Sequence, residues 1–272
     1  MRRIVTILEN RMYKLVPPES GSTDSAPPLL VIRNLSCAYT SRAHGLFGRL
    51  EKKPVLDNIN LEIKQGEIFG LSGESGCGKS TIARCILGLI DYTGDIFING
   101  ENRKNTEKTE NREKTAGRSE TGKSSRQEQR LHLARLSQMV FQDSGASLNP
   151  VKSIGWLLEE AMVIHNLYTK EERKAKVDEM LIRVGLDPTY SKRMPHELSG
   201  GQKQRVCIGR SLILAPQLLI ADEAINSLDV GAGAQILNLF RDLNRDFGIG
   251  ILFISHNKNA AEYLCDRIAE FK

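Results

Sequence analysis

The chain has 272 residues, of which 40% are hydrophobic and 26% charged, an ordinary composition for a globular protein of one large or two small domains. The net charge is only +5 and much of the excess lies in one polar segment, so we expect no nucleic-acid partner. The five cysteines are odd in number and none form a C-x-x-C pair, which favours a reducing compartment and argues against a disulfide framework or metal cluster. No apolar run approaches a membrane span, and Glu9 ends the apolar start too early for a signal peptide. We therefore expect a cytosolic protein unless a partner holds it at a membrane.

Residues 1–28 end in a tract rich in Pro, Ser and Gly, and we expect a flexible lead-in before a single domain at 29–272. Met12 within it is an alternative start. Residues 101–130 have Ala116 as their only apolar residue, so they cannot bury enough surface to offset their ordering entropy. We interpret them as a solvated insertion, in preference to a dedicated binding patch.

In the remaining segments, the spacing of apolar residues alternates between that typical of strands and that typical of helices. Strands are predicted at 29–39, 55–64, 67–71, 94–100, 137–142, 217–222 and 248–256. Helices are predicted at 81–89, 154–164, 170–184 (with Thr169 as N-cap), 203–214 and 232–247. Several strands are apolar on both faces and alternate with helices, which indicates a parallel sheet covered on both sides.

Residues 73–81 carry the first chemical motif. Their sequence is Gly73-Glu74-Ser75-Gly76-Cys77-Gly78-Lys79-Ser80-Thr81, which matches the phosphate-binding P-loop pattern G-x-x-x-x-G-K-[ST]. A buried strand precedes it and a helix follows, so glycine N–H groups and the helix dipole can both face a phosphate. Lys79 can reach the β- and γ-phosphates, and Ser80 can bind Mg²⁺. The alternative is a glycine-rich turn with a chance lysine.

Asp222 and Glu223 directly follow a buried strand, at the edge of a parallel sheet where ligands bind. Asp222 fits the second acid associated with Mg²⁺ in P-loop enzymes, and Glu223 could deprotonate the attacking water. A solvated acidic pair at a strand end is the alternative. The P-loop in the same chain favours the functional interpretation.

Four further motifs resemble those of the ATP-binding subunits of ABC transporters. The sequence Leu198-Ser199-Gly200-Gly201-Gln202 matches the LSGGQ signature, which other P-loop enzymes lack. Phe141-Gln142-Asp143 resembles the Q-loop, Ser227-Leu228-Asp229 the D-loop, and Ile254-Ser255-His256 the switch-histidine loop. These motifs stand in the family's order, and the resemblance covers about residue 29 to the C-terminus without the polar insertion. Within the family, the chain is most similar to the ATPases of oligopeptide, dipeptide and nickel importers.

The resemblance implies a P-loop NTPase (RecA-like) α/β fold, in which a parallel sheet core carries an antiparallel β subdomain and an α-helical subdomain at 144–197. It implies that ATP is bound by Tyr39, Gly73, Glu74, Ser75, Gly76, Cys77, Gly78, Lys79, Ser80 and Thr81, and by Ser199, Gly200, Gly201 and Gln202. Mg²⁺ would be served by Ser80, Gln142 and Asp222, with Glu223 as general base and His256 and Gln142 at the γ-phosphate. Tyr39 would stack on adenine, although a core tyrosine is the alternative.

The resemblance also implies partners. Ser199 to Gln202 would complete the site of a second subunit, so hydrolysis needs a homo- or heterodimer. The helical subdomain would dock on transmembrane permease subunits that receive substrate from a solute-binding protein. The expected location is the cytoplasmic face of the cell membrane, with ATP hydrolysis driving import of peptides or nickel.

Two departures from the family pattern bear on activity. After Glu223 the family usually has Pro-Thr-Ser-Ala-Leu-Asp, whereas this chain has Ala224-Ile225-Asn226-Ser227-Leu228-Asp229. Ala224 lacks the fixed φ of a proline, and Ile225 is expected to put a bulky apolar group beside the site. The chain also stops 272 − 256 = 16 residues after His256, so we expect a shortened sheet with exposed ladder groups. These departures leave open a poorly hydrolysing regulatory or truncated subunit paired with an intact sister ATPase. A soluble ABC ATPase outside transport is a further alternative, but the tandem domains or long coiled coil usual there are absent from the sequence.

Overall fold

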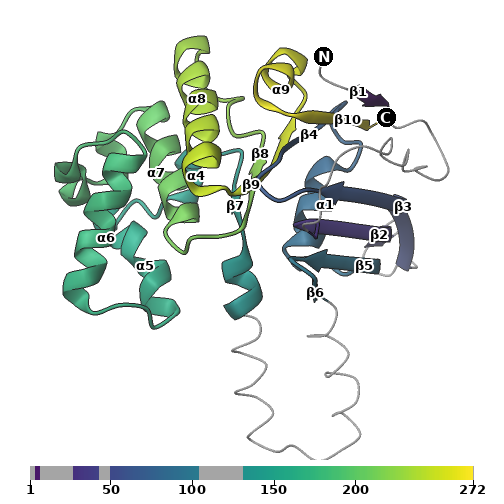
Figure 1. The fold of residues 1–272 in the computed structure, drawn as a ribbon, viewed down its shortest axis with the longest axis horizontal. Helices are drawn as coiled ribbons and strands as arrows, with labels where there is room; N and C mark the ends of the chain where they lie inside the picture. The colour runs from purple at the N-terminus through teal and green to yellow at the C-terminus, as the bar shows by residue number, and fades with distance from the viewer. Residues whose placement is uncertain (1–3, 7–26, 43–49, 104–130, 272) are drawn as a thin grey trace, which may run out of the picture.

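A computed structural model of the chain describes residues 4–6, 27–42, 50–103 and 131–271 (Figure 1). Its centre is a parallel sheet of six strands in the order β1-β10-β4-β9-β8-β7. The bounds are β1 Ile4–Thr6, β10 Arg267–Phe271, β4 Ile68–Gly73, β9 Gly250–Ser255, β8 Leu218–Asp222 and β7 Ser137–Val140. The carboxyl ends of β4, β8 and β9 therefore meet at one edge of the sheet, which confirms the expected parallel α/β core.

The central strands are apolar at successive positions because each strand feeds two cores. In β8, Leu218 and Ile220 pack into the core under the antiparallel sheet, whereas Leu219 and Ala221 pack into the core under the helices. Side chains alternate between the two faces of a strand, so a strand covered on both sides needs an unbroken apolar run. Burying one such Leu or Ile contributes about 1.5–3 kcal/mol.

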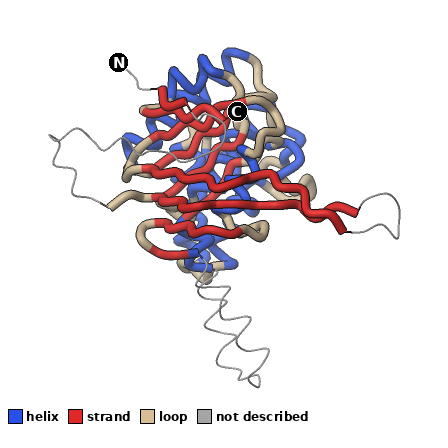
Figure 2. The backbone as a smooth tube through the Cα atoms, turned by 90° about the vertical axis from the view of Figure 1, so that its right-hand side faces the viewer, coloured by secondary structure: helices blue, strands red, loops and turns tan. Residues whose placement is uncertain are grey.

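A second sheet is antiparallel and has the order β3-β2-β5-β6. The bounds are β3 Leu50–Ile63, β2 Leu30–Arg42, β5 Thr93–Ile98 and β6 Glu101–Asn102. The ribbon of β2 and β3 extends beyond the body of the molecule (Figure 2). Helix α1, Lys79–Ile86, lies between the two sheets and buries Ile82 and Ile86 in their shared core. This arrangement confirms the expected antiparallel β subdomain.

The helices form a separate lobe and a cover for the parallel sheet (Figure 1). The lobe contains α4 Ser144–Ser147, α5 Ile154–Ile164, α6 Lys170–Arg183, 3-10 turns at Pro188–Lys192 and Pro195–Glu197, and α7 Gly200–Leu212. The cover is formed by α8 Val230–Phe247 and α9 Lys258–Leu264. Thr169 caps α6 in a capping box with Glu172, as its sequence predicts. No helix among the described residues is long and apolar enough to cross a membrane.

The structure differs from expectation near both ends of the sequence. Ile4–Thr6, inside the expected flexible lead-in, pairs with β10 as a parallel strand, whereas residues 7–26 lie outside the described residues. β10 is hydrogen-bonded to β4 on one side and to β1 on the other, so the expected row of exposed ladder groups is wrong for Ile268–Glu270. The paired strands β1 and β10 lie more than 260 positions apart in the chain, so no local sequence pattern could predict their pairing. Most of the polar insertion, residues 104–130, also lies outside the described residues.

Candidate functional site: a P-loop at the carboxyl edge of the sheet

The P-loop joins the end of β4 to the start of α1. Gly78 adopts φ +109° at the N-cap of α1, and a Cβ there would lie 2.8 Å from Leu56 Cδ2. At Gly73 a Cβ would lie 2.1 Å from the carbonyl oxygen of Phe271 in β10. Both positions therefore exclude side chains, and the loop curves tightly enough for its N–H groups to converge on an anion.

Lys79 is buried at the centre of this loop, with 4% of its surface exposed. Its Nζ donates to the carbonyl oxygens of Gly73, at 2.8 Å, and Glu74, at 2.6 Å. The ammonium group is thereby held inside the loop at the N-terminus of α1, where helix dipole and cation both favour an anion such as a phosphate.

Ser80 and Asp222 are brought together although 142 positions separate them. The Ser80 hydroxyl donates to Asp222 Oδ1 at 3.0 Å. Burial raises the pKa of the Asp222 carboxyl above its ordinary value, and the hydrogen bond from Ser80 partly opposes this. A hydroxyl and a carboxylate at the open edge of a sheet are hard oxygen donors of the kind that Mg²⁺ prefers. These residues therefore fit the cation that the sequence predicts.

Glu223 and His256 form a second pair at the same edge. His256 Nδ1 lies 3.3 Å from Glu223 Oε1, and also 3.3 Å from the side-chain nitrogen of Asn226. Glu223 has φ +50°, an uncommon conformation for a residue with a side chain, and its N–H donates to Ile254 O at 2.9 Å. This backbone bond ties the turn after β8 to the end of β9. The sequence did not predict the contact with Asn226, a residue that stood out there only as a departure from the family pattern.

The structure corrects the expectation for Ile225. Its side chain is only 9% exposed and belongs to the hydrophobic cluster that includes Ile236 and Phe240 of α8. Ala224, at 1% exposed, is buried in the same cluster. Two consecutive apolar side chains after Glu223 therefore point into the core, and the bulk of Ile225 does not lie exposed beside the site.

For Gln142 and Tyr39, no hydrogen bond or ion pair to the P-loop or to the acidic residues after β8 is present among the described residues. Gln142 lies two residues beyond β7, at the same edge as Asp222, and is exposed. Tyr39 lies in β2 of the antiparallel sheet and is 39% exposed. Exposure favours a stacking role for Tyr39 over the alternative of a core tyrosine, since a ring must be accessible to stack on a base.

The signature residues lie at the N-terminus of α7. Ser199 caps the helix and Gln202 completes a capping box, with the Gln202 amide also donating to the Tyr190 hydroxyl at 3.1 Å. They line a hollow of about 670 Å³ together with Ser227, Leu228 and Asp229 of the D-loop. No P-loop residue lines this hollow, so the described chain separates the two sets of residues predicted to bind ATP.

The glycines of the signature are not required by the fold of the chain itself. Gly200 and Gly201 have no positive φ, and a Cβ at either position would make only ordinary contacts, at 3.8 Å to Leu228 and 3.4 Å to Ala232. Packing within the chain therefore does not require glycine at these two positions, which lie at a helix N-terminus suited to anions.

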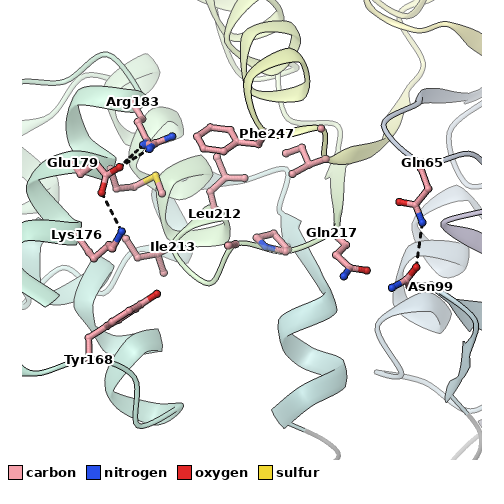
Figure 3. Close-up of a pocket in the computed structure, with 15 residues that line it drawn as sticks. Gln65, Asn99, Tyr168, Lys176, Glu179, Arg183, Leu212, Ile213, Gln217 and Phe247 are labelled. Atoms are coloured by element: carbon pink, nitrogen blue, oxygen red, sulfur yellow. Dashed lines mark hydrogen bonds and ion pairs between the residues drawn. The ribbon is translucent and has the colours of Figure 1, made fainter. Parts of the chain in front are cut away.

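Another hollow, of about 430 Å³, opens at the amino ends of β8 and β9 (Figure 3). It is lined by apolar side chains such as Leu212 and Phe247, with Arg183 and Lys176 held by Glu179 on the α6 side. It lies at the opposite edge of the sheet from Asp222 and contains none of the phosphate-binding glycines. It is therefore not the nucleotide site.

Known proteins resemble this chain in both sequence and fold. The family model described as "ABC transporter" matches residues 56–226. The chain is 39% identical over 242 residues to the oligopeptide transport ATP-binding protein AppF of Bacillus subtilis, covering 88% of this chain and 68% of AppF. It is 38% identical over 254 residues to the glutathione import ATP-binding protein GsiA of Pectobacterium atrosepticum, covering 93% of this chain but only 38% of GsiA.

Among solved structures, a dimeric ATP-binding cassette, MJ0796, bound to ADP and Pi superposes with a TM-score of 0.69 at 27% identity, covering 89% of this chain and 94% of that one. The fold and site thus define a P-loop ATPase. The chain belongs to the ABC transporter family, as one of its ATP-binding and ATP-hydrolysing subunits.

Proposed function

We propose that the chain hydrolyses ATP to drive import of a peptide-type substrate through a membrane permease. The observation that carries this proposal is the convergence of Lys79, Ser80 and Asp222 at the sheet edge, in a chain that also carries the LSGGQ sequence on α7. AppF and GsiA are named for oligopeptide transport and glutathione import, which favours the peptide class over nickel.

The proposed roles follow the geometry of the site. Lys79 and the P-loop N–H groups would bind the phosphates, while Ser80, Asp222 and Gln142 would hold Mg²⁺ and its waters. Mg²⁺ supplies charge neutralisation for the β- and γ-phosphate oxygens. Glu223 would accept the proton of the attacking water, and His256 would contact the γ-phosphate.

A second subunit is part of this proposal. The hollow at Ser199 to Gln202 holds no P-loop residue, so a nucleotide on one chain would need the signature of another chain to be enclosed. The glycines at 200 and 201 leave space for that approach, and the N-terminus of α7 would add its dipole at the γ-phosphate. Formation of an ATP-bound dimer by this chain alone would show that an identical copy can serve as the second chain.

The permease would dock on the helical lobe. A hollow of about 260 Å³ there is lined by Phe141 and Ile164, which are about half exposed, and by Arg210. Phe141 immediately precedes Gln142, so contact at this hollow can be coupled to the γ-phosphate end of the site. The proposed location is peripheral, at the cytoplasmic face of the membrane, with a solute-binding protein acting on the other side.

ATP turnover of the full chain tests the mechanism. Lys79→Ala should weaken ATP binding and lower turnover, and Glu223→Gln should lower kcat by about a hundredfold or more while leaving ATP binding intact. Glu223→Gln should also accumulate as an ATP-bound dimer in size-exclusion chromatography. The exposed carboxylate of Glu262 provides a matched control, since Glu262→Gln should retain normal turnover.

The outcomes distinguish the proposed function from its main rival. Unchanged hydrolysis in both Lys79→Ala and Glu223→Gln would reject the mechanism. The unmodified chain would instead be a regulatory subunit if its own turnover is barely above that of Glu223→Gln and rises when a related ATPase subunit is added.

A further inference from the structure

The ring of His256 faces two partners that require opposite roles of one nitrogen. Nδ1 lies 3.3 Å from Glu223 Oε1 and 3.3 Å from the Asn226 side-chain nitrogen. A carboxylate can only accept, so Nδ1 must carry a proton to bond with Glu223. An amide N–H can only donate, so Nδ1 must present its lone pair to bond with Asn226. A neutral ring cannot satisfy both in this arrangement.

Asn226 is held in this place by the backbone. Its N–H donates to Glu223 O at 3.1 Å and closes the turn that Glu223 begins with φ +50°. The Glu223 N–H in turn donates to Ile254 O at 2.9 Å, two residues before His256. The turn and the end of β9 are therefore bound to one another, and the three side chains are brought together by main-chain hydrogen bonds rather than by surface packing alone.

Each orientation of the Asn226 amide selects one tautomer of the ring. With its oxygen toward His256, the amide accepts from Nδ1–H together with Glu223, and Nε2 carries the lone pair. With its nitrogen toward His256, the amide donates to Nδ1, and the proton is on Nε2. Rotation of the amide by 180° exchanges the two arrangements without moving the backbone.

We propose that Asn226 is a positioning residue that selects the Nε2–H tautomer of His256 and thereby frees Glu223. In this state Nε2–H can donate to a phosphate oxygen, and the Nδ1 lone pair repels the Glu223 carboxylate, which becomes available to the attacking water. In the other state Glu223 is occupied by the ring and Nε2 has no proton to donate. This inference rests on the roles proposed above for Glu223 and His256.

The tautomer itself is the first measurement. The ring ¹⁵N shifts of His256 are recorded in the ¹⁵N-labelled full chain with Mg²⁺ and a non-hydrolysable ATP analogue, and assigned by their loss in His256→Ala. We expect the wild type to show the proton on Nε2. Asn226→Asp, which has nearly the same shape but offers only acceptors, should show it on Nδ1. The same tautomer in both proteins would overturn the proposal.

Kinetics test whether the selection matters for turnover. Asn226→Leu should lower kcat about tenfold, the scale of one lost hydrogen bond, and leave the KM for ATP within about twofold. In a His256→Ala background Asn226→Leu should cause no further loss, because its effect passes through the ring. A further loss of similar size, or a wild-type kcat for Asn226→Leu, would overturn the positioning role.

These results separate this inference from the proposed function. If His256→Ala alone keeps wild-type turnover, the proposed role of His256 fails. A different result is that His256→Ala lowers turnover, while Asn226→Leu keeps the wild-type turnover and Asn226→Asp keeps the wild-type tautomer of His256. The proposed function then stands and the role of Asn226 is rejected.

Discussion

At the end of β8, the Asp222 carboxylate has only the Ser80 hydroxyl as a side-chain hydrogen-bond partner among the described residues, and burial raises its pKa. The folded chain therefore binds this proton more tightly than the unfolded chain, whose aspartate titrates near its ordinary value of 3.8. It follows that the free energy of unfolding falls as the pH rises from below 3.8 through the raised pKa of Asp222. Without nucleotide and cation, burial of this carboxyl therefore lowers the free energy of unfolding at neutral pH relative to its value at low pH.

Asp222→Asn should therefore raise the free energy of unfolding of the nucleotide-free protein at pH 7, because the amide keeps the hydrogen bond and carries no charge to desolvate. The difference from wild type should disappear at about pH 3, where the aspartate is protonated in both states. Urea unfolding at the two pH values measures it. An equal stabilisation at both would show that shape rather than charge is responsible.

At the scale of the element, β10 is attached to the core by the side chain of Arg267. Its Nη2 donates to Glu62 O at 2.8 Å and to Glu67 Oε2 at 3.1 Å, and its guanidinium lies over the ring of Phe69. Glu67 is 8% exposed and also accepts from the Lys64 N–H at 2.8 Å. The ion pair thus holds β10 to the turn that precedes β4, the strand that leads into the P-loop.

Arg267→Met should lower the free energy of unfolding by about 2 kcal/mol, since it keeps the packing over Phe69 but removes the charge that compensates a buried carboxylate. Urea denaturation measures the loss. In the double variant with Glu67→Gln the loss should be smaller than the sum of the two single losses, because the buried charge is then absent. Strict additivity would mean that the pair contributes nothing specific.

At the scale of the whole molecule, α7 connects the helical lobe to the parallel sheet. Arg205 on this helix donates to Val184 O at the end of α6, at 2.7 Å, and to Gln235 Oε1 on α8, at 3.1 Å. One guanidinium thus joins the lobe to the core within a few residues of the signature. A lobe that docks on a permease must transmit its position to the nucleotide through such contacts.

Arg205→Met should increase hydrogen exchange at the C-terminal end of α6 and in the first turns of α8, because both lose the same anchor. Arg173→Met is a matched control, since Arg173 pairs with Glu159 inside the lobe, at 2.7 Å. It should increase exchange within α5 and α6 and leave α8 unchanged. Equal effects of the two variants on α8 would show that the lobe is coupled to the core by other contacts.

Local patterns were sufficient for most elements and for the residue types of the site. The apolar spacing of residues 154–164 predicted α5 at its observed bounds, and Thr169 predicted the cap of α6, because helix periodicity and capping act within a few residues. The P-loop was equally local, since strand, glycine turn and helix are consecutive.

The parallel α/β core, the P-loop and the two sets of motif residues could thus be predicted from the order of the amino acids, because their information lies in short periods and consecutive positions. The folded chain was needed to show that Ile225 turns into the core, that β10 lies between β1 and β4, and that Asn226 lies 3.3 Å from His256. The last two contacts join residues 30 or more positions apart, and they depend on which strand ends the sheet brings side by side.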